Sequence, residues 1–186
     1  MSVSNSDPQN QIARFYDGIA AGYDQIFGIH SEVVESDLKV LFSAIGRHHF
    51  NRVFEIGCGP GVLTGRLLRV VDYCLAIDVA PEMVEIARRN LAVFKDHNWA
   101  VEETDILNMP AHLRSQKFNA VFFWGNGMTH IPPQRYDEFA SSVGEILEPD
   151  GLLIINMRDG KEWVKLAGKL DLLSRSEMGA NFVHIY

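Results

Sequence analysis

Short apolar runs alternate with amphipathic stretches through the middle of the chain, and this alternation is the first indication of the fold. The apolar runs predict strands at residues 52–56, 73–78, 99–103, 119–124 and 152–157. The stretches between them predict helices at residues 61–70, 80–91 and 133–147. Strands that alternate with helices form parallel sheets through right-handed crossovers, and continuous apolar runs are typical of strands buried on both faces. The pattern therefore predicts an α/β fold with a doubly wound, mostly parallel sheet and helices on both of its faces.

The amino-terminal part of the chain has a different pattern. Residues 1–10 are polar and predict disorder. Residues 11–27 carry apolar and aromatic side chains at mixed helical spacing, and residues 31–45 predict an amphipathic helix. We interpret residues 1–45 as one helical segment that precedes the sheet.

The signal weakens after residue 157. A helix at 161–175 and a strand at 181–186 are the elements that the pattern still favours there. The chain stops on this strand-like run, with no polar tail. We therefore expect carboxyl-terminal strands that are incomplete, or a terminal strand that pairs with something else.

Length and composition restrict the class of protein. A chain of 186 residues with 47% hydrophobic residues suits one domain, which we assign to residues 1–186. The formal net charge of -7 disfavours nucleic acid or an anionic membrane as a partner. The polar amino terminus is not a secretory signal, and no apolar run reaches the roughly 18 residues of a membrane span. We expect a cytoplasmic protein with a small-molecule partner, and the sequence leaves a monomer and a homodimer open.

The two cysteines indicate neither disulfide nor metal chemistry. Cys58 lies in a glycine-rich corner and Cys74 in an apolar run. Two cysteines do not make a disulfide framework, and the sequence has no metal-ligand spacing. We predict two packed thiols and no metal site.

Three glycines mark the corner between the first predicted strand and the helix after it. Gly57, Gly59 and Gly61 stand in "EIGCGPGVL". Glycine accepts positive φ and lets a ligand approach the main chain, and ligands of parallel sheets bind beyond the carboxyl ends of the strands. We infer that a ligand rests on residues 57–61; the alternative is a tight turn and nothing more. A dinucleotide corner would need its third glycine at position 62, which is Val62.

Acidic residues follow the next two predicted strands. Asp78 ends the second strand, where a carboxylate accepts hydrogen bonds from both hydroxyl groups of a ribose. The alternative is that Asp78 caps the helix that begins near Pro81. Asp105 follows the third strand, where its carboxylate would accept a hydrogen bond from an adenine amino group, and the alternative is an ordinary loop aspartate. Together with the glycines, these acids predict an adenosyl pocket.

Five segments carry a family resemblance, in the family's order: "VFEIGCGPGVLTGRLL", "AIDVAPEMVEIARRN", "VEETDILNMP", "FNAVFFWGNGMTHI" and "LEPDGLLIINMR". They resemble the class I S-adenosylmethionine-dependent methyltransferases. The resemblance implies a Rossmann-like sheet with one strand more than this sequence predicts. It also implies S-adenosyl-L-methionine as the cofactor, bound by a core at 50–158. We assign the cofactor contacts to Glu55, Gly57, Gly59, Asp78, Val79, Met83, Asp105, Ile106 and Trp124.

"WGNGMTHI" and "IINMRDG" resemble a narrower group, the small-molecule N-methyltransferases of the glycine and sarcosine type. That resemblance implies that Asn126 and Arg158 hold the substrate's carboxylate and that His130 lies near the cofactor, as a candidate general base. The alternatives are a structural hydrogen bond for His130 and a local ion pair for Arg158. An arginine of that group that grips the cofactor's carboxylate has no match in "IHSEVVESDLKVLF", although Arg14 lies earlier.

"FYDGIAAGYD" resembles the lid segment of the broader group, whose tyrosines close over the methyl group. The matching residues are Tyr16 and Tyr23, and the alternative is ordinary helix packing. We assign catalytic roles to His130, Tyr16 and Tyr23. The sequence thus predicts methyl transfer to a small molecule, with an amine as the expected acceptor. O- or C-methylation, a non-catalytic cofactor-binding protein and a nicotinamide-dependent oxidoreductase are the alternatives.

Overall fold

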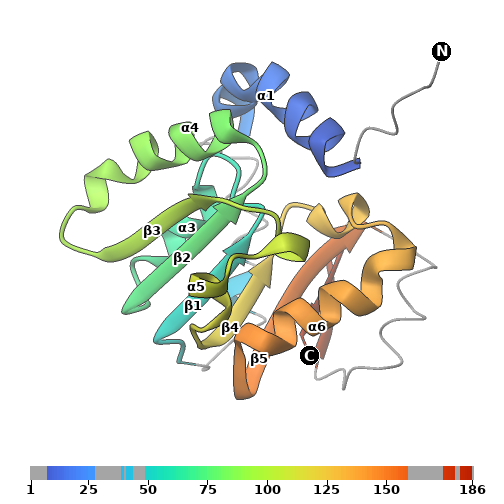
Figure 1. The fold of residues 1–186 in the computed structure, drawn as a ribbon. Helices are drawn as coiled ribbons and strands as arrows, with labels where there is room; N and C mark the ends of the chain where they lie inside the picture. The colour runs from blue at the N-terminus through green and yellow to red at the C-terminus, as the bar shows by residue number, and fades with distance from the viewer. Residues whose placement is uncertain are drawn as a thin grey trace.

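A seven-stranded sheet forms the centre of the computed structural model, with helices packed on both of its faces (Figure 1). The structure describes residues 8–27, 39, 41–43, 49–158, 174–178 and 181–185. The strands are β1 (Arg52–Ile56), β2 (Tyr73–Asp78), β3 (Asn98–Glu103), β4 (Phe118–Phe123), β5 (Leu147–Arg158), β6 (Ser174–Met178) and β7 (Asn181–Ile185). The helices are α1 (Pro8–Phe27), α3 (Val62–Leu67), α4 (Pro81–Leu91), α5 (Ala111–Arg114) and α6 (Tyr136–Ile146). Short 3-10 turns are η1 (Ala92–Phe94), η2 (Ile106–Asn108), η3 (Gly127–His130) and η4 (Pro133–Arg135).

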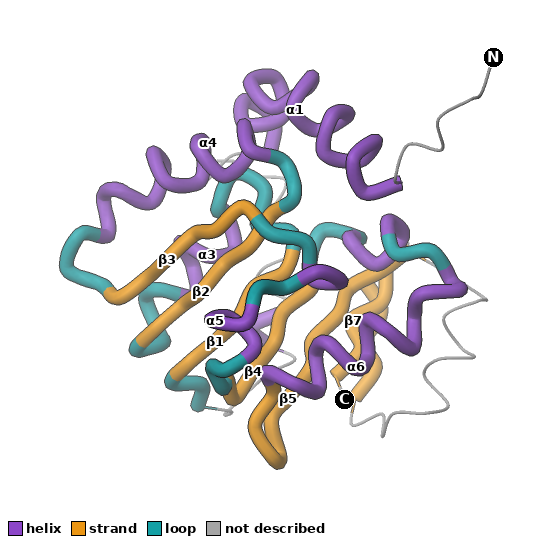
Figure 2. The backbone as a smooth tube through the Cα atoms, in the orientation of Figure 1, coloured by secondary structure: helices purple, strands orange, loops and turns teal. Residues whose placement is uncertain are grey.

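The strands lie in the order β3-β2-β1-β4-β5-β7-β6. The strands β1 to β5 pair in parallel, and β7 is antiparallel to both β5 and β6. Figure 2 shows β7 beside β5 at one side of the sheet. The chain order of the strands reverses between β1 and β4, and in open α/β sheets this switch point is where ligands bind.

The two faces of the sheet are covered by different helices because successive strand side chains point to opposite sides. Val53 of β1 belongs to a core that includes Leu67 of α3 and Leu91 of α4. The next residue, Phe54, belongs to the opposite core, which includes Phe139 of α6. Side chains of β2, β4 and β5 alternate between the same two cores. The doubly wound arrangement that the sequence predicted is therefore confirmed.

The strand predictions for β1 and β2 match the observed bounds, but the carboxyl-terminal part differs. The strand β5 begins at Leu147, before the predicted start, and its pairing with β4 shifts register between Phe118 and Ala120. The sequence missed β6 because "SRSEM" has no apolar alternation, and it pairs with β7 through the backbone. The terminal strand predicted at 181–186 is present as β7, which pairs with β5 and β6.

At the amino terminus, α1 begins at Pro8, so the predicted disorder is wrong for residues 8–10, and residues 1–7 lie outside the described part. The helix predicted at 31–45 also lies mostly outside it; residues 39 and 41–43 are helical. Most of the helix predicted at 161–175 likewise falls on residues that are not described.

Helix α1 lies against the amino-terminal part of α4 (Figure 1). The two helices bury Ala20 and Met83 in a small apolar cluster. The N-cap residue of α4 is Ala80, whose side chain makes no capping hydrogen bond. The N–H group of Glu82 in the first turn of α4 instead donates to Oδ1 of Asp17, at 3.0 Å. A carboxylate at that end is stabilised by the free N–H groups and by the helix dipole, so α1 itself supplies the cap of α4.

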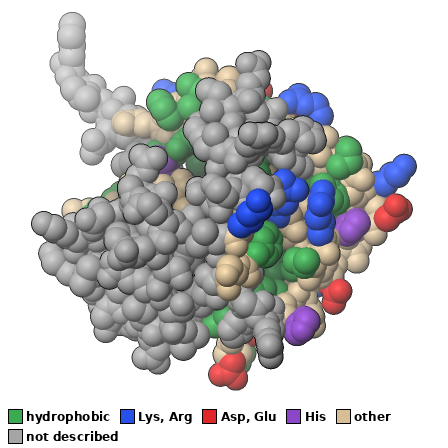
Figure 3. Space-filling view, turned by 180° about the vertical axis from the view of Figure 1, so that it is seen from behind, with side chains coloured by type: hydrophobic (Ala, Val, Ile, Leu, Met, Phe, Trp, Pro, Cys, Tyr) green, Lys and Arg blue, Asp and Glu red, His purple; other side chains and the backbone are tan. Residues whose placement is uncertain are grey.

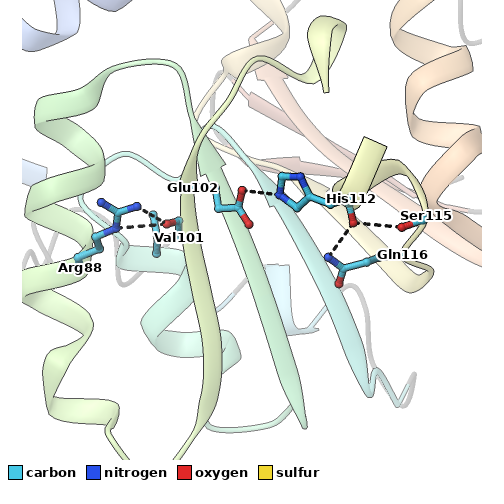
Figure 4. A network of polar contacts seen from close by, with 6 residues as sticks. All are labelled: Arg88, Val101, Glu102, His112, Ser115 and Gln116. Atoms are coloured by element: carbon cyan, nitrogen blue, oxygen red, sulfur yellow. Dashed lines mark hydrogen bonds and ion pairs between the residues drawn. The ribbon is translucent and has the colours of Figure 1, made fainter. Parts of the chain in front are cut away.

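The edge strand β3 is held from both sides (Figure 4). The guanidinium group of Arg88 on α4 donates from Nε and Nη2 to the carbonyl oxygen of Val101, at 3.2 and 2.8 Å. On the other side, Nε2 of His112 on α5 lies 2.9 Å from Oε2 of Glu102. These contacts tie the end of the sheet to a helix on each face.

Charge is not spread evenly over the surface. Figure 3 shows the back of the molecule, where a group of Lys and Arg side chains of the described part lies near the middle, and further basic and acidic side chains lie toward the right of the view.

We expect Gly61→Ala to lower the free energy of unfolding by about 1–2 kcal/mol, because alanine is strained in the left-handed region. Gly61 has φ 82, and a Cβ atom there would lie 3.3 Å from the side chain of Leu91. The matched control is Gly144→Ala on the exposed face of α6, where no atom lies within 4 Å of an added Cβ. That change should stabilise the helix by about 0.5–1 kcal/mol. Urea-induced unfolding of both variants tests this, and equal stabilities would contradict it.

Candidate active site

A cavity of about 370 Å³ lies at the carboxyl-terminal edge of the sheet, around the switch point between β1 and β4. It brings together every residue that the sequence analysis assigned to catalysis or to cofactor contact, and Asn126 as well. These residues are Tyr16, Tyr23, Glu55, Gly57, Gly59, Asp78, Val79, Met83, Asp105, Ile106, Trp124, Asn126 and His130. Because these residues line the same cavity, they are suited to form one site. The role of each residue in that site stays a prediction.

The glycine corner is both a tight turn and a wall of the cavity. Gly57, Gly59 and Gly61 all have positive φ, at 67°, 50° and 82°. The N–H group of Cys58 donates to the carbonyl oxygen of Ile77 at 3.0 Å, which ties the corner to β2. Gly57 and Gly59 line the cavity, and an added Cβ at Gly59 would meet no atom within 4 Å. The backbone at Gly59 therefore faces open space in the cavity, and the binding of a ligand there stays a prediction.

Asp78 is bound to this corner through its carboxylate. Its Oδ2 accepts the N–H of Gly59 at 2.8 Å, and its Oδ1 accepts the N–H of Ala80 at 2.9 Å. Asp78 does not cap α4, because that role belongs to Asp17. Burial raises the pKa of Asp78, and the backbone hydrogen bonds oppose the rise. A carboxylate has about four acceptor positions, so Asp78 keeps capacity for the hydroxyl groups of a ligand.

Glu55 is a second buried acid in the cavity wall. It is 2% exposed, and the hydroxyl group of Thr64 on α3 donates to its Oε2 at 2.6 Å. The pKa of Glu55 is raised to about 8. Burial is the largest cause of this rise, the hydrogen bond from Thr64 opposes it, and the charge of Asp78 adds to it. The two acids thus share one poorly hydrated wall, in which a cationic ligand would be favoured.

Asp105 has a local structural role, as one alternative anticipated. It is the N-cap of η2, and its Oδ1 accepts the N–H of Leu107 at 2.9 Å. Its Oδ2 accepts from Nδ2 of Asn108, also at 2.9 Å. Asp105 nevertheless lines the cavity, as do the buried Ile106 and Met83 of α4. Cap and ligand contact are compatible, because each carboxylate oxygen has a second lone pair.

Three aromatic side chains lie on the α1 side of the cavity. The hydroxyl group of Tyr16 lies 2.9 Å from Nε2 of His130, and the two rings are perpendicular, with centroids 5.5 Å apart. The ring of Tyr23 contacts that of Tyr16 edge to face at 6.0 Å. Burial raises the pKa of both tyrosines and lowers the pKa of His130. All three side chains are therefore uncharged near neutral pH.

The loop after β4 is held by a residue of β5. The N–H group of Asn126 donates to Oδ1 of the buried Asn156 at 2.9 Å, which fixes Asn126 at φ 65. Trp124, 9% exposed, joins the core beneath this loop and also borders the cavity. Arg158 is the last residue of β5, and its side chain lies outside the described part of the structure. Arg14 is exposed and does not line the cavity.

Other chemistries find little support in the described ranges. Within them, no group of three or more His, Cys, Asp or Glu residues is placed to hold a metal ion. No helix described here combines the length and apolar character that crossing a bilayer requires. Cys58 and Cys74 are free and buried, as predicted. Burial raises the pKa of both thiols well above the usual range, so neither is prepared for nucleophilic attack.

Comparison with known proteins assigns the chain to a family. Residues 53–151, more than half of the chain, match a family model described as a methyltransferase domain. The chain belongs to the class I S-adenosylmethionine-dependent methyltransferases. This family membership removes the oxidoreductase alternative.

Two curated methyltransferases illustrate the likeness in sequence. Glycine N-methyltransferase of Mus musculus is 26% identical over 159 residues, which cover 78% of this chain and 54% of that protein. Malonyl-(acyl-carrier protein) O-methyltransferase of Bacillus cereus is 25% identical over 118 residues, which cover 62% of this chain and 44% of that protein. The chain thus spans about half the length of the curated relatives it matches.

Solved methyltransferase structures share the fold. The DhpI–SAH complex superposes with a TM-score of 0.77 at 19% identity and covers 95% of this chain and 94% of that one. The N-methyltransferase NodS of Bradyrhizobium japonicum, in complex with S-adenosyl-L-homocysteine, gives a TM-score of 0.74 at 14% identity and covers 96% and 97%. At these identities the likeness supports the fold of the methyltransferase domain and nothing finer.

Three polar residues that hold the site were not among those predicted from the sequence. Asn156 interrupts the apolar run "LLIINM", and this interruption was a usable signal. Thr64 sits in an amphipathic helix where nothing distinguishes it from a surface residue, although it is fully buried. Asp17 caps a helix that is 65 residues away, and no local pattern could indicate that contact.

We expect His130 to titrate below 6.5, its ordinary value, because its half-buried ring disfavours the imidazolium form. The unfolded chain then binds the proton more tightly than the folded one. The stability contributed by neutral His130 is fully present above pH 6.5 and is lost as the pH falls below that value through the lower pKa of the folded state. A histidine NMR titration, with His130→Asn to assign the signal, measures the midpoint. A value at or above 6.5 would contradict the expectation.

Proposed function

We propose that this protein binds S-adenosylmethionine in the cavity and transfers its methyl group to a small molecule, with an amine nitrogen as the acceptor. One observation carries the proposal. A single cavity joins the open backbone at Gly59, the carboxylate of Asp78 and the aromatic group of Tyr16, Tyr23 and His130. This reaction needs polar groups that bind a nucleoside and uncharged side chains around the methyl group. The cavity contains both kinds of group.

The polar wall fits the adenosyl part of the cofactor. Asp78 is buried yet keeps acceptor capacity for the two ribose hydroxyl groups. Val79, Met83 and Ile106 line the cavity with apolar groups that would contact an adenine ring, and Asp105, which also lines it, would accept from the adenine amino group. Gly57 and Gly59 leave room for the methionine part beside the backbone. These features support the family's cofactor at this place in the fold.

The sulfonium of the cofactor supplies an activated methyl group, so the protein needs no nucleophile of its own. Its residues have to exclude water and align the acceptor's lone pair with the carbon–sulfur bond. Tyr16 and Tyr23 line the cavity from α1, and Asn126 lines it from the loop after β4. His130, kept neutral by burial, has a nitrogen lone pair for the proton that an ammonium acceptor must lose.

The choice of acceptor has two candidates. The likeness to glycine N-methyltransferase and the acidic cavity wall favour an amine, and Arg158 at the end of β5 would hold its carboxylate. The likeness to malonyl-(acyl-carrier protein) O-methyltransferase is of similar identity, so O-methylation of a carboxylic acid is the second candidate. A protein that binds the cofactor without turnover is the remaining alternative.

Incubation with S-adenosylmethionine and pooled amines, phenols and carboxylic acids tests the proposal. We expect an amine that also bears a carboxylate, such as glycine or sarcosine, to gain the mass of one CH₂ group in mass spectrometry. The Arg158→Ala variant should raise the KM for that acceptor and leave cofactor affinity unchanged. A preferred acceptor without an anionic group would remove the role of Arg158, and methylated acids alone would establish the second candidate.

We expect Asp78→Asn to weaken binding of S-adenosylhomocysteine by about tenfold to a hundredfold, because hydrogen bonds to a charged group contribute about 1.5–3 kcal/mol. The matched control is Asp72→Asn, an exposed aspartate outside the cavity. Calorimetric titration gives the affinities, and thermal unfolding checks that both variants are folded. Unchanged affinity in folded Asp78→Asn would remove the ribose assignment.

A further inference from the structure

Glu55 and Thr64 form a buried pair whose purpose the fold does not explain. Thr64 is 0% exposed and Glu55 is 2% exposed, and the hydroxyl hydrogen bond between them is 2.6 Å long. A buried carboxyl group costs free energy that an apolar side chain at the same place in β1 would not. Thr64 does not line the cavity, whereas Glu55 does. The pair therefore connects the interior of α3 to the ligand site.

The hydrogen bond from Thr64 makes the two carboxyl oxygens of Glu55 different in their partners. Oε2 accepts from Thr64, and the described part of the chain supplies no partner for Oε1. Because Glu55 borders the cavity, Oε1 is the oxygen left for a ligand. An acceptor at that position suits a donor that carries positive charge, such as an ammonium group.

We propose that Thr64 is a positioning residue of the cofactor site: it holds Glu55 so that one oxygen faces the cavity, and Glu55 releases a proton there when a ligand with a cationic group binds. The inference rests on the proposed function, because the expected ligand carries an ammonium group. In the empty cavity the neutral carboxyl group avoids a buried charge. A cation beside Oε1 reverses that preference, and the proton leaves to solvent.

The surroundings of Glu55 agree with this switch. Asp78 from β2 is the charged group that raises its pKa, which is about 8, and Thr64 from α3 is the group that lowers it. The neighbouring thiols of Cys58 and Cys74 titrate well above the usual range. Across the cavity, the tyrosines of α1 have raised pKa values and His130 has a lowered one. The thiols, the tyrosines and His130 are thus shifted away from the range around pH 8, where Glu55 is expected to change charge.

Calorimetric titration with S-adenosylhomocysteine at pH 7, in buffers of different ionisation enthalpy, measures the protons released. With a pKa of about 8 in the empty site, roughly nine-tenths of the Glu55 carboxyl groups are protonated at pH 7. We expect the protein to release close to that fraction of a proton more than Glu55→Gln does. The subtraction removes the protons that the ligand's own amino group exchanges on binding. The ratio of the protein's affinity to that of Glu55→Gln should rise with pH, up to about tenfold per unit, and level off above pH 8.

Thr64→Val separates positioning from packing. Loss of the hydroxyl group removes the contact that lowers the pKa of Glu55, so the pH at which affinity levels off should move up by about one unit or more. Thr64→Ser keeps the hydroxyl group and should restore the original profile. Asp78→Asn should move the profile the other way, because it removes a negative charge near Glu55. The infrared carbonyl band of a protonated carboxyl group should fall when ligand is added, which tests the switch without any Thr64 variant.

The outcomes distinguish this inference from the proposed function. If the protein binds neither S-adenosylmethionine nor S-adenosylhomocysteine, the proposed function fails. If it binds them and the proton release equals that of Glu55→Gln, the cofactor site stands and the switch is wrong. If the pH profiles of Thr64→Val and Thr64→Ser coincide, Thr64 is a packing residue only, and the positioning role is wrong.

Discussion

The hydrogen bond from the N–H of Gly59 to the carboxylate of Asp78 is the interaction on which the rest of the site depends. It joins two neighbouring strand ends, and it requires the backbone at Gly59 to adopt φ 50, which glycine accepts readily. The second bond, from Cys58 to Ile77, holds the same corner against β2. These contacts hold Asp78 beside the backbone of the glycine corner. Both the corner and Asp78 line the cavity.

Burial of acids is the electrostatic consequence of this arrangement. Asp78 and Glu55 stand on adjacent strands in a wall that water reaches poorly, and burial is the largest cause of the raised pKa of both. Each acid is held by donors that the fold supplies, from the backbone for Asp78 and from Thr64 for Glu55. Among the described residues that line the cavity there is no lysine or arginine. The site is therefore suited to a ligand that brings its own positive charge.

Helix α1 closes the other side through two attachments of different kinds. Asp17 caps α4, and Tyr16 meets His130 from the loop after β4. The contact of Asp17 attaches α1 to α4. The contact of Tyr16 with His130 joins two residues that line the cavity. The tyrosines are positioned by the first contact and face the expected ligand through the second, which gives the segment its place in the proposed reaction.

The sequence alone determined the alternation of strands and helices, the glycine corner and the acids at the strand ends. Burial of a parallel strand on both faces favours a continuous apolar run, and a positive φ favours glycine, so both leave a local pattern. The strand β6 was not predicted from the sequence, because "SRSEM" pairs through its backbone and backbone pairing leaves no apolar period. Only the tertiary structure decided the partners of Asp17, Asn156 and Thr64. Those hydrogen bonds join different elements across 65, 30 and 9 residues of sequence, and which side chains meet depends on how the helices and strands pack.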